Sequence, residues 1–158
     1  MSEIIRIPHI ENYNMEFING ELILTPKKQY ISEKNLLNTN LNYSKIQKCI
    51  IKKNKEIIST RDKYSSILKD IWKCMSIPKI LKTTTFNIKL TNEAKKNGYN
   101  WCDDIQLSFQ AKNSRETLRE IINMIKINNF TIDLVIQLKL NSNSNSNSNS
   151  NSIIYFKN

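Results

Sequence analysis

Alternating hydrophobic and polar positions in the C-terminal half of the chain predict β-strands. Two such runs cover residues 86–91 and 105–112, a third covers residues 132–140, and the chain closes on the apolar run 153–157. Strict alternation is typical of a strand with one buried and one solvated face, because successive side chains point to opposite sides. Four strands are therefore expected in this half.

Between the second and third strands the apolar spacing becomes helical. Asn113, followed three residues later by Glu116, matches a helix-capping pattern, and the helix should end near Asn128-Asn129. Its apolar stripe consists of Leu118, Ile121, Ile122 and Ile125. The order ββαββ predicts a two-layer domain over residues 83–158, with the helix across an antiparallel or mixed sheet. This order resembles β-grasp and related two-layer sandwiches in topology alone.

Six Asn-Ser pairs, residues 141–152, separate the last two predicted strands. A tract of this composition buries no apolar area and is expected to be a flexible loop. Strands on either side can still pair, because the entropy cost of closing a loop rises slowly with its length. We interpret the tract as an expanded hairpin turn, with an Asn-rich assembly segment as the alternative.

Residues 1–43 predict an N-terminal arm that carries one β-hairpin. Strand-forming residues flank Asn19-Gly20 within residues 15–25, and Asn-Gly favours the two-residue turn of a hairpin. An isolated hairpin is marginally stable in water, so its apolar side should dock on another part of the chain or on a partner.

The central segment, residues 44–82, has a seven-residue apolar spacing that predicts a long basic helix ending before Pro78. Its spacing is set by Ile50, Ile57, Tyr64 and Ile71. The resulting seam, over residues 46–74, would pack on the rest of the chain or, alternatively, on a second copy. A break near Ser59-Thr60 would divide the helix in two. The predicted fold class is α+β.

Charge singles out the same segment. The chain carries a net charge of +10, and residues 44–82 hold 11 basic and 3 acidic side chains. A local field of this sign attracts polyanions, so nucleic acid and an acidic protein surface are candidate partners. The alternative is that the lysines only form a solvated helix face. The residues expected to contact phosphates are Lys45, Lys48, Lys52, Lys53, Lys55, Arg61, Lys63, Lys69 and Lys73.

Scarcity of several residue types excludes whole classes of site. With 2 glycines and 3 cysteines in the chain, no glycine-rich phosphate loop and no paired Cys/His zinc site can be assembled, and we expect no cofactor or metal. His9 is the single histidine and lies in an acidic arm, where we expect it to be exposed rather than catalytic. No apolar run suits a membrane span or signal peptide, so a cytoplasmic protein is expected.

One polar cluster suggests chemistry. Asp103 and Asp104 precede a predicted strand that ends in Gln110 and Lys112. Metal-dependent nucleases hold Mg²⁺ with acidic residues placed in this way and use a lysine beside them, although Gln110 replaces the usual second acid. The alternative is a turn leading into the strand, with Trp101 capping the core and the aspartates facing solvent.

The chain's bias toward Ile, Asn and Lys, together with the Asn-Ser tract, resembles proteins from very AT-rich genomes, especially amoeba-infecting giant DNA viruses and some protists. This resemblance is compositional and carries no family motif. It implies a viral accessory or virion-associated protein in the host cytoplasm. Three hypotheses follow: a non-enzymatic interaction protein, a nucleic-acid-binding protein that uses residues 45–82, and a metal-dependent nuclease.

Overall fold

The computed structural model describes residues 13–139 and 152–158, and its contacts divide the chain into two units, Met1–Tyr30 and Ile31–Asn158. The boundary between these units, after Tyr30, does not coincide with the predicted boundaries after residues 43 and 82. The reason is that strands from the central and C-terminal segments pair in one sheet, so neither segment has a core of its own.

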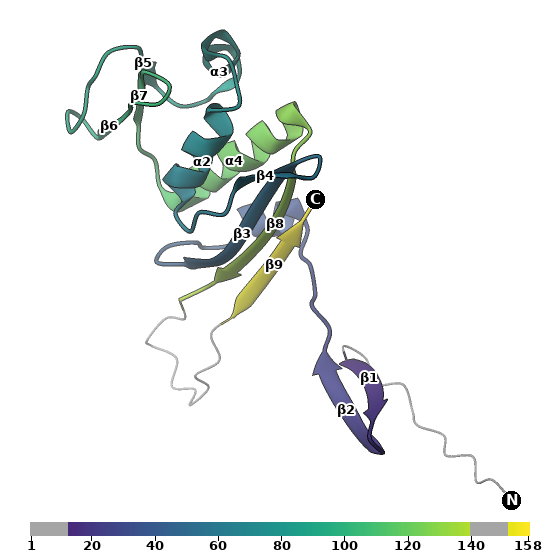
Figure 1. The fold of residues 1–158 in the computed structure, drawn as a ribbon. Coiled ribbons are helices and arrows are strands. Elements are labelled where there is room, and N and C mark those ends of the chain that lie inside the picture. The colour runs from purple at the N-terminus through teal and green to yellow at the C-terminus, as the bar shows by residue number, and fades with distance from the viewer. Residues whose placement is uncertain (1–12, 140–151) are drawn as a thin grey trace, which may run out of the picture. The chain divides into compact units, whose positions relative to one another are not determined.

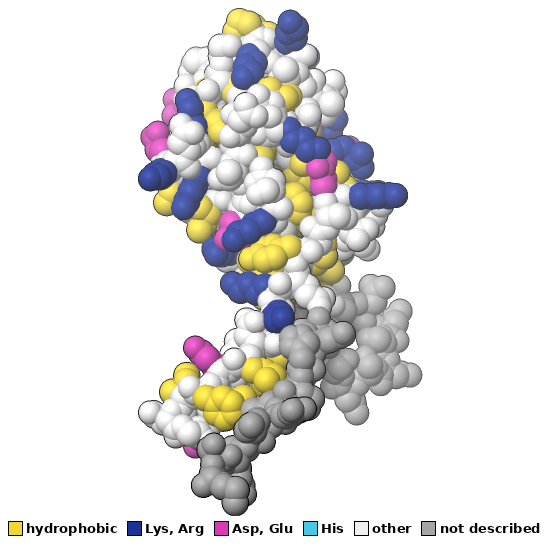
Figure 2. Space-filling model, turned by 90° about the vertical axis from the view of Figure 1, so that its right-hand side faces the viewer, with side chains coloured by type: hydrophobic (Ala, Val, Ile, Leu, Met, Phe, Trp, Pro, Cys, Tyr) yellow, Lys and Arg dark blue, Asp and Glu magenta, His cyan; other side chains and the backbone are white. Residues whose placement is uncertain are grey.

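The first unit contains the predicted hairpin, which is confirmed. Strands β1 (Tyr13–Ile18) and β2 (Glu21–Pro26) pair antiparallel around a turn in which Asn19 and Gly20 have φ values of 52° and 81°. Two positive φ values are what a type I′ turn requires. One face of the hairpin is apolar and exposed, and Figure 2 shows hydrophobic side chains gathered on it.

The second unit is built on a four-stranded antiparallel sheet (Figure 1). Its strands, in spatial order, are β4 (Glu56–Ser59), β3 (Lys45–Lys53), β8 (Thr131–Gln137) and β9 (Ile153–Lys157). The pairing of β8 with β9 is the predicted C-terminal hairpin. The Asn-Ser loop predicted between them, residues 141–152, lies outside the described residues except for Ser152, whose carbonyl accepts a hydrogen bond from the Leu138 N–H.

The long helix predicted within residues 44–82 is wrong. The segment folds as β3, a turn at Asn54 (φ 58°), β4 and the short helix α2 (Tyr64–Trp72). A β-bulge between Ile46 and Lys48 adds one residue to β3, so two buried positions on one face, Ile46 and Cys49, stand three residues apart. That spacing imitates a helix although the segment is a strand.

The apolar seam predicted over residues 46–74 is therefore not a surface that a second copy could cover. Its residues come from two strands and a helix, and three of them, Ile46, Ile67 and Ile71, are between 0 and 8% exposed within the core. The first expectation, packing on the rest of the chain, describes these three side chains.

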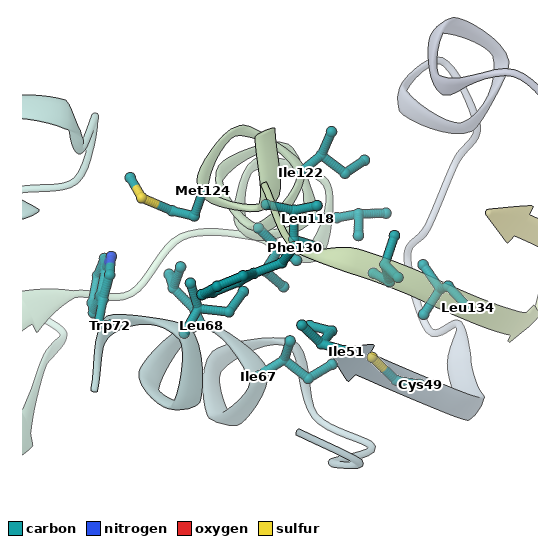
Figure 3. Packing of buried hydrophobic residues seen from close by; sticks show 14 of the residues in the cluster. Cys49, Ile51, Ile67, Leu68, Trp72, Leu118, Ile122, Met124, Phe130 and Leu134 are labelled. Atoms are coloured by element: carbon teal, nitrogen blue, oxygen red, sulfur yellow. The ribbon is translucent and has the colours of Figure 1, made fainter. Parts of the chain in front are cut away.

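Helices cover one face of the sheet. Helix α4 (Ser114–Asn128) begins where its capping pattern predicted, with the Asn113 side chain accepting a hydrogen bond from the Glu116 N–H at 2.8 Å. It ends at Asn129, which adopts φ 55°. Helix α2 packs beside α4, and α1 (Glu33–Leu37) contacts α4 and β9. Figure 3 shows side chains of α2, α4 and β3 meeting around Phe130.

The first two strands of the predicted ββαββ domain form a separate sheet, so that arrangement is not what the structure has. Strands β5 (Ile88–Lys89), β7 (Leu107–Gln110) and β6 (Tyr99–Cys102) pair in that order. Helix α3 (Ile77–Thr83) precedes them. The coarser prediction, an α+β fold, holds. Phe109 of β7 packs edge-on against Trp72 at 5.2 Å between ring centroids, which joins this sheet to α2.

Among residues 13–139 and 152–158, no helix is long and apolar enough to cross a membrane.

Candidate nucleic-acid interface

Alternation along β3 and β8 gives the four-stranded sheet two different faces. Cys49 and Ile51 lie opposite Leu134 and Ile132, and all four side chains are buried beneath the helices. The residues between them point to the opposite side of the sheet. We call this side the open face; it is formed by Lys45, Lys48, Ile50, Lys52, Thr131, Asp133, Val135 and Gln137.

The open face is positively charged. Lys45, Lys48 and Lys52 are exposed along β3, and Asp133 is its one carboxylate. Asp133 pairs with Lys48, whose Nζ lies 3.0 Å from Oδ2. Neither Lys45 nor Lys52 forms an ion pair within the part of the chain that the structure describes. Two ammonium groups on this face are therefore available to contact an anion directly.

A hollow lies at each end of the β3–β8 pair. The first, about 540 Å³, is lined by Tyr43, Lys45, Gln137 and Lys139 together with Ser44 and Leu138. The second, about 220 Å³, lies beside Lys52 and Asp133. Both open on the sheet where lysines stand, so the charge and the concave surface coincide.

Six of the nine basic residues expected to contact phosphates lie away from the open face. Lys53 and Lys55 stand at the β3–β4 turn, and Lys63 precedes α2. Lys69 lies 5.6 Å above the Phe109 ring. The structure brings Lys45, Lys48 and Lys52 together and does not bring the other six to them, because strands, a turn and a short helix replace the single long helix that was expected.

Arg61 and Lys73, the remaining two, lie against acidic side chains. Arg61 Nε is 3.4 Å from Asp70 Oδ2, and Lys73 Nζ is 3.6 Å from Asp70 Oδ1 and 2.7 Å from Asp104 Oδ2. The hydrogen bond to Asp104 raises the pKa of Lys73, and the same bond lowers the pKa of Asp104. Their charge is partly neutralised within the protein.

The residues of the nuclease hypothesis are not assembled into a site. Asp103 and Asp104 precede β7 and Lys112 follows it, so the strand separates them. Lys112 Nζ donates to the Thr85 carbonyl at 3.0 Å and lies 4.7 Å above the Phe86 ring. No group of three His, Cys, Asp or Glu side chains within the described ranges could hold a metal ion. His9 lies outside these ranges.

Sequence reasoning missed Tyr43, Gln137 and Lys139 as candidate site residues. Gln137 and Lys139 belong to the alternating run that was predicted as a strand, so its polar side was visible in the sequence. The pairing of Lys45 with Gln137, which are 92 positions apart in the chain, could not be seen in the sequence. Only that pairing shows that the polar side of β8 lies next to the lysines of β3, on the same face of the sheet.

Comparison of the chain with protein-family models, with curated proteins and with solved structures found no match.

Proposed function

We propose that the protein is a non-enzymatic nucleic-acid-binding protein that contacts phosphates through the open face of its four-stranded sheet. The observation that carries the proposal is the row of Lys45, Lys48 and Lys52 on one strand, facing the same side, with one carboxylate among them. We also propose that the protein acts in the host cytoplasm or the virion, because its composition resembles that of proteins from amoeba-infecting giant DNA viruses.

The linear arrangement favours nucleic acid over an acidic protein surface. At about 3.3 Å per strand residue, the row from Lys45 to Lys52 spans roughly 20 Å. A nucleic acid presents charges at regular intervals along such a line, and neutralising them releases condensed counterions. Figure 2 shows Lys and Arg side chains spread over the surface in that view, so net charge alone does not mark a site, whereas strand register does.

The test is a titration of fluorescent single-stranded DNA, RNA and duplex DNA, followed by anisotropy at about 50 and 200 mM salt. Three to four phosphate contacts predict a fall in single-strand affinity of roughly 20- to 50-fold between these salt concentrations. In Lys45→Gln/Lys52→Gln, affinity at the lower salt should fall roughly 10- to 60-fold, and the salt dependence should become shallower by a slope of about 1.4.

A matched control removes the same charge elsewhere. Lys82 at the end of α3 and Lys96 in the turn before β6 are exposed and belong to neither face of the four-stranded sheet. Lys82→Gln/Lys96→Gln should bind within about twofold of the unmodified protein, since only long-range attraction is lost. Equal losses in the two double variants would show a diffuse charge effect and overturn the proposal, as would absence of binding at the lower salt.

A further inference from the structure

The larger hollow on the open face contains an aromatic side chain that the core does not use. Tyr43 lies two residues before the start of β3 and is 81% exposed, and it lines the hollow with Gln137 and Lys139. The volume, about 540 Å³, falls within the range of pockets that hold a small organic ligand. An exposed ring beside lysines is what recognition of an unpaired base uses, because every base presents a π-face for stacking.

The backbone holds Tyr43 in a conformation that tyrosine rarely adopts. Its φ is 60°, in the left-handed region, which costs free energy for a residue with a side chain. On one side of it Leu41 is buried, and on the other the Ser44 hydroxyl lies 3.0 Å from the Tyr64 hydroxyl. The Ser44 N–H also donates to the Leu41 carbonyl at 3.0 Å. Fixed neighbours therefore present the ring to solvent.

The polar side chains around the Tyr43 ring could bind the polar edge of a base and the phosphates of a nucleotide. Lys139 Nζ lies 5.1 Å above the Tyr43 ring, and Lys45 lines the same hollow. The Gln137 Oε1 accepts a hydrogen bond from Gln47 Nε2 at 2.6 Å, which orients the Gln137 amide and leaves its NH₂ group as a donor. The hollow thus combines one stacking surface, one amide donor and two cations.

We infer that this hollow binds one unpaired base of a single-stranded nucleic acid. The base stacks on Tyr43 and receives a hydrogen bond from Gln137, while Lys45 and Lys139 contact the adjoining phosphates. A base within a duplex is already stacked on its neighbours and cannot lie on the ring, so the hollow selects single strands. This inference rests on the proposed function, because the rest of the strand follows the lysines of the open face.

The test compares Tyr43→Asn and Tyr43→Phe by anisotropy with a short oligothymidylate and with a duplex. Tyr43→Asn should weaken single-strand binding by about 5- to 150-fold, the loss expected for one stacked base, and should leave duplex binding unchanged. Tyr43→Phe keeps the ring and should bind as the unmodified protein does. Asparagine tolerates positive φ well, so Tyr43→Asn should also melt at the same temperature or higher.

A second lysine–aromatic pair supplies the control. Lys89 Nζ lies 5.5 Å above the Tyr99 ring in the three-stranded sheet, away from the hollow, so Tyr99→Leu should leave single-strand affinity unchanged. Unchanged affinity in Tyr43→Asn, with a loss in Lys45→Gln/Lys52→Gln, would overturn the base site and leave the proposed function standing. Absence of single-strand binding by the unmodified protein would overturn both.

Discussion

The two faces of the four-stranded sheet differ in chemistry although the same strands form them: one face is apolar and the other carries the lysines. On β3, buried Cys49 and Ile51 alternate with exposed Lys48 and Lys52. The covered face packs against α2 and α4 and holds the fold together, whereas the open face carries the exposed Lys45, Lys48 and Lys52. Neighbouring residues should therefore have separable roles, in stability on one face and in binding on the other.

The largest expected effect is on the covered face. Leu134 of β8 is 1% exposed beneath the helices, so Leu134→Ala should lower the free energy of unfolding by about 2–5 kcal/mol through lost burial and a cavity. Lys52→Ala on the open face should change it by less than about 0.5 kcal/mol. Urea denaturation measures both, and comparable losses would contradict the separation of roles.

Thiol reactivity should distinguish the covered face from the exposed surface. Burial, with smaller contributions from Asp133 and Asp70, raises the pKa of Cys49 from 9.0 to about 12, which reduces its thiolate fraction by about a thousandfold near neutral pH. Cys74 lies at the surface beyond α2. An alkylating reagent should modify Cys74 first and Cys49 only after unfolding. Rapid modification of Cys49 in the folded protein, followed by mass spectrometry, would contradict its burial.

Thr85→Val tests a buried polar contact that belongs to stability alone. Glu120 of α4 is 2% exposed and accepts hydrogen bonds from the Thr85 hydroxyl at 2.5 Å and from the Thr85 N–H at 3.3 Å. Removing the hydroxyl should cost about 1–3 kcal/mol of stability, because a buried carboxylate loses a donor. Nucleic-acid affinity should not change. A variant that folds normally but binds weakly would connect this contact to the open face.

The smallest effect is expected at the Lys73–Asp104 ion pair, which lies away from both faces. The hydrogen bond from Lys73 lowers the pKa of Asp104 in the folded protein. The pair therefore stabilises the fold fully above the pKa that Asp104 has in the unfolded chain, and this stabilisation disappears as the pH falls through the pKa of Asp104 in the folded protein. The stability difference between Asp104→Asn and the unmodified protein should therefore shrink in acid. Lys73→Gln should leave nucleic-acid affinity unchanged, and a loss matching that of Lys45→Gln would contradict the assignment of phosphate contacts to the open face.

Elements that depend on neighbouring residues could be predicted from the sequence. The Asn19-Gly20 turn and the Asn113 cap each act within a few residues, and the hairpin and α4 appear where these signals stand. Strand β3 was missed because the seven-residue spacing that predicted a helix joins residues of three elements, with Ile50 in β3, Ile57 in β4 and Ile71 in α2. Strand β6 was missed because its start lies in a polar turn with positive φ at Asn97 and Gly98.

The candidate site could be predicted only in part. Its lysines were among those selected by charge, but charge could not separate Lys52 on the open face from Lys53 beside it. Strand alternation does so once β3 is known to be a strand. The role of Tyr43 depends on a left-handed backbone and on Lys139, which reaches it through strand pairing, and neither is a local property of the sequence.

The most direct test of the central claim is a two-dimensional ¹H–¹⁵N NMR titration with a short single-stranded oligonucleotide. The account predicts that the largest amide shifts map to the open face, around Lys45, Lys52 and Gln137, and extend from Lys45 to Tyr43 in the hollow that these residues share. Amides of α2 and α4 should move little. Shifts concentrated on the helices, on the three-stranded sheet or on the N-terminal hairpin, with the open face unchanged, would contradict it.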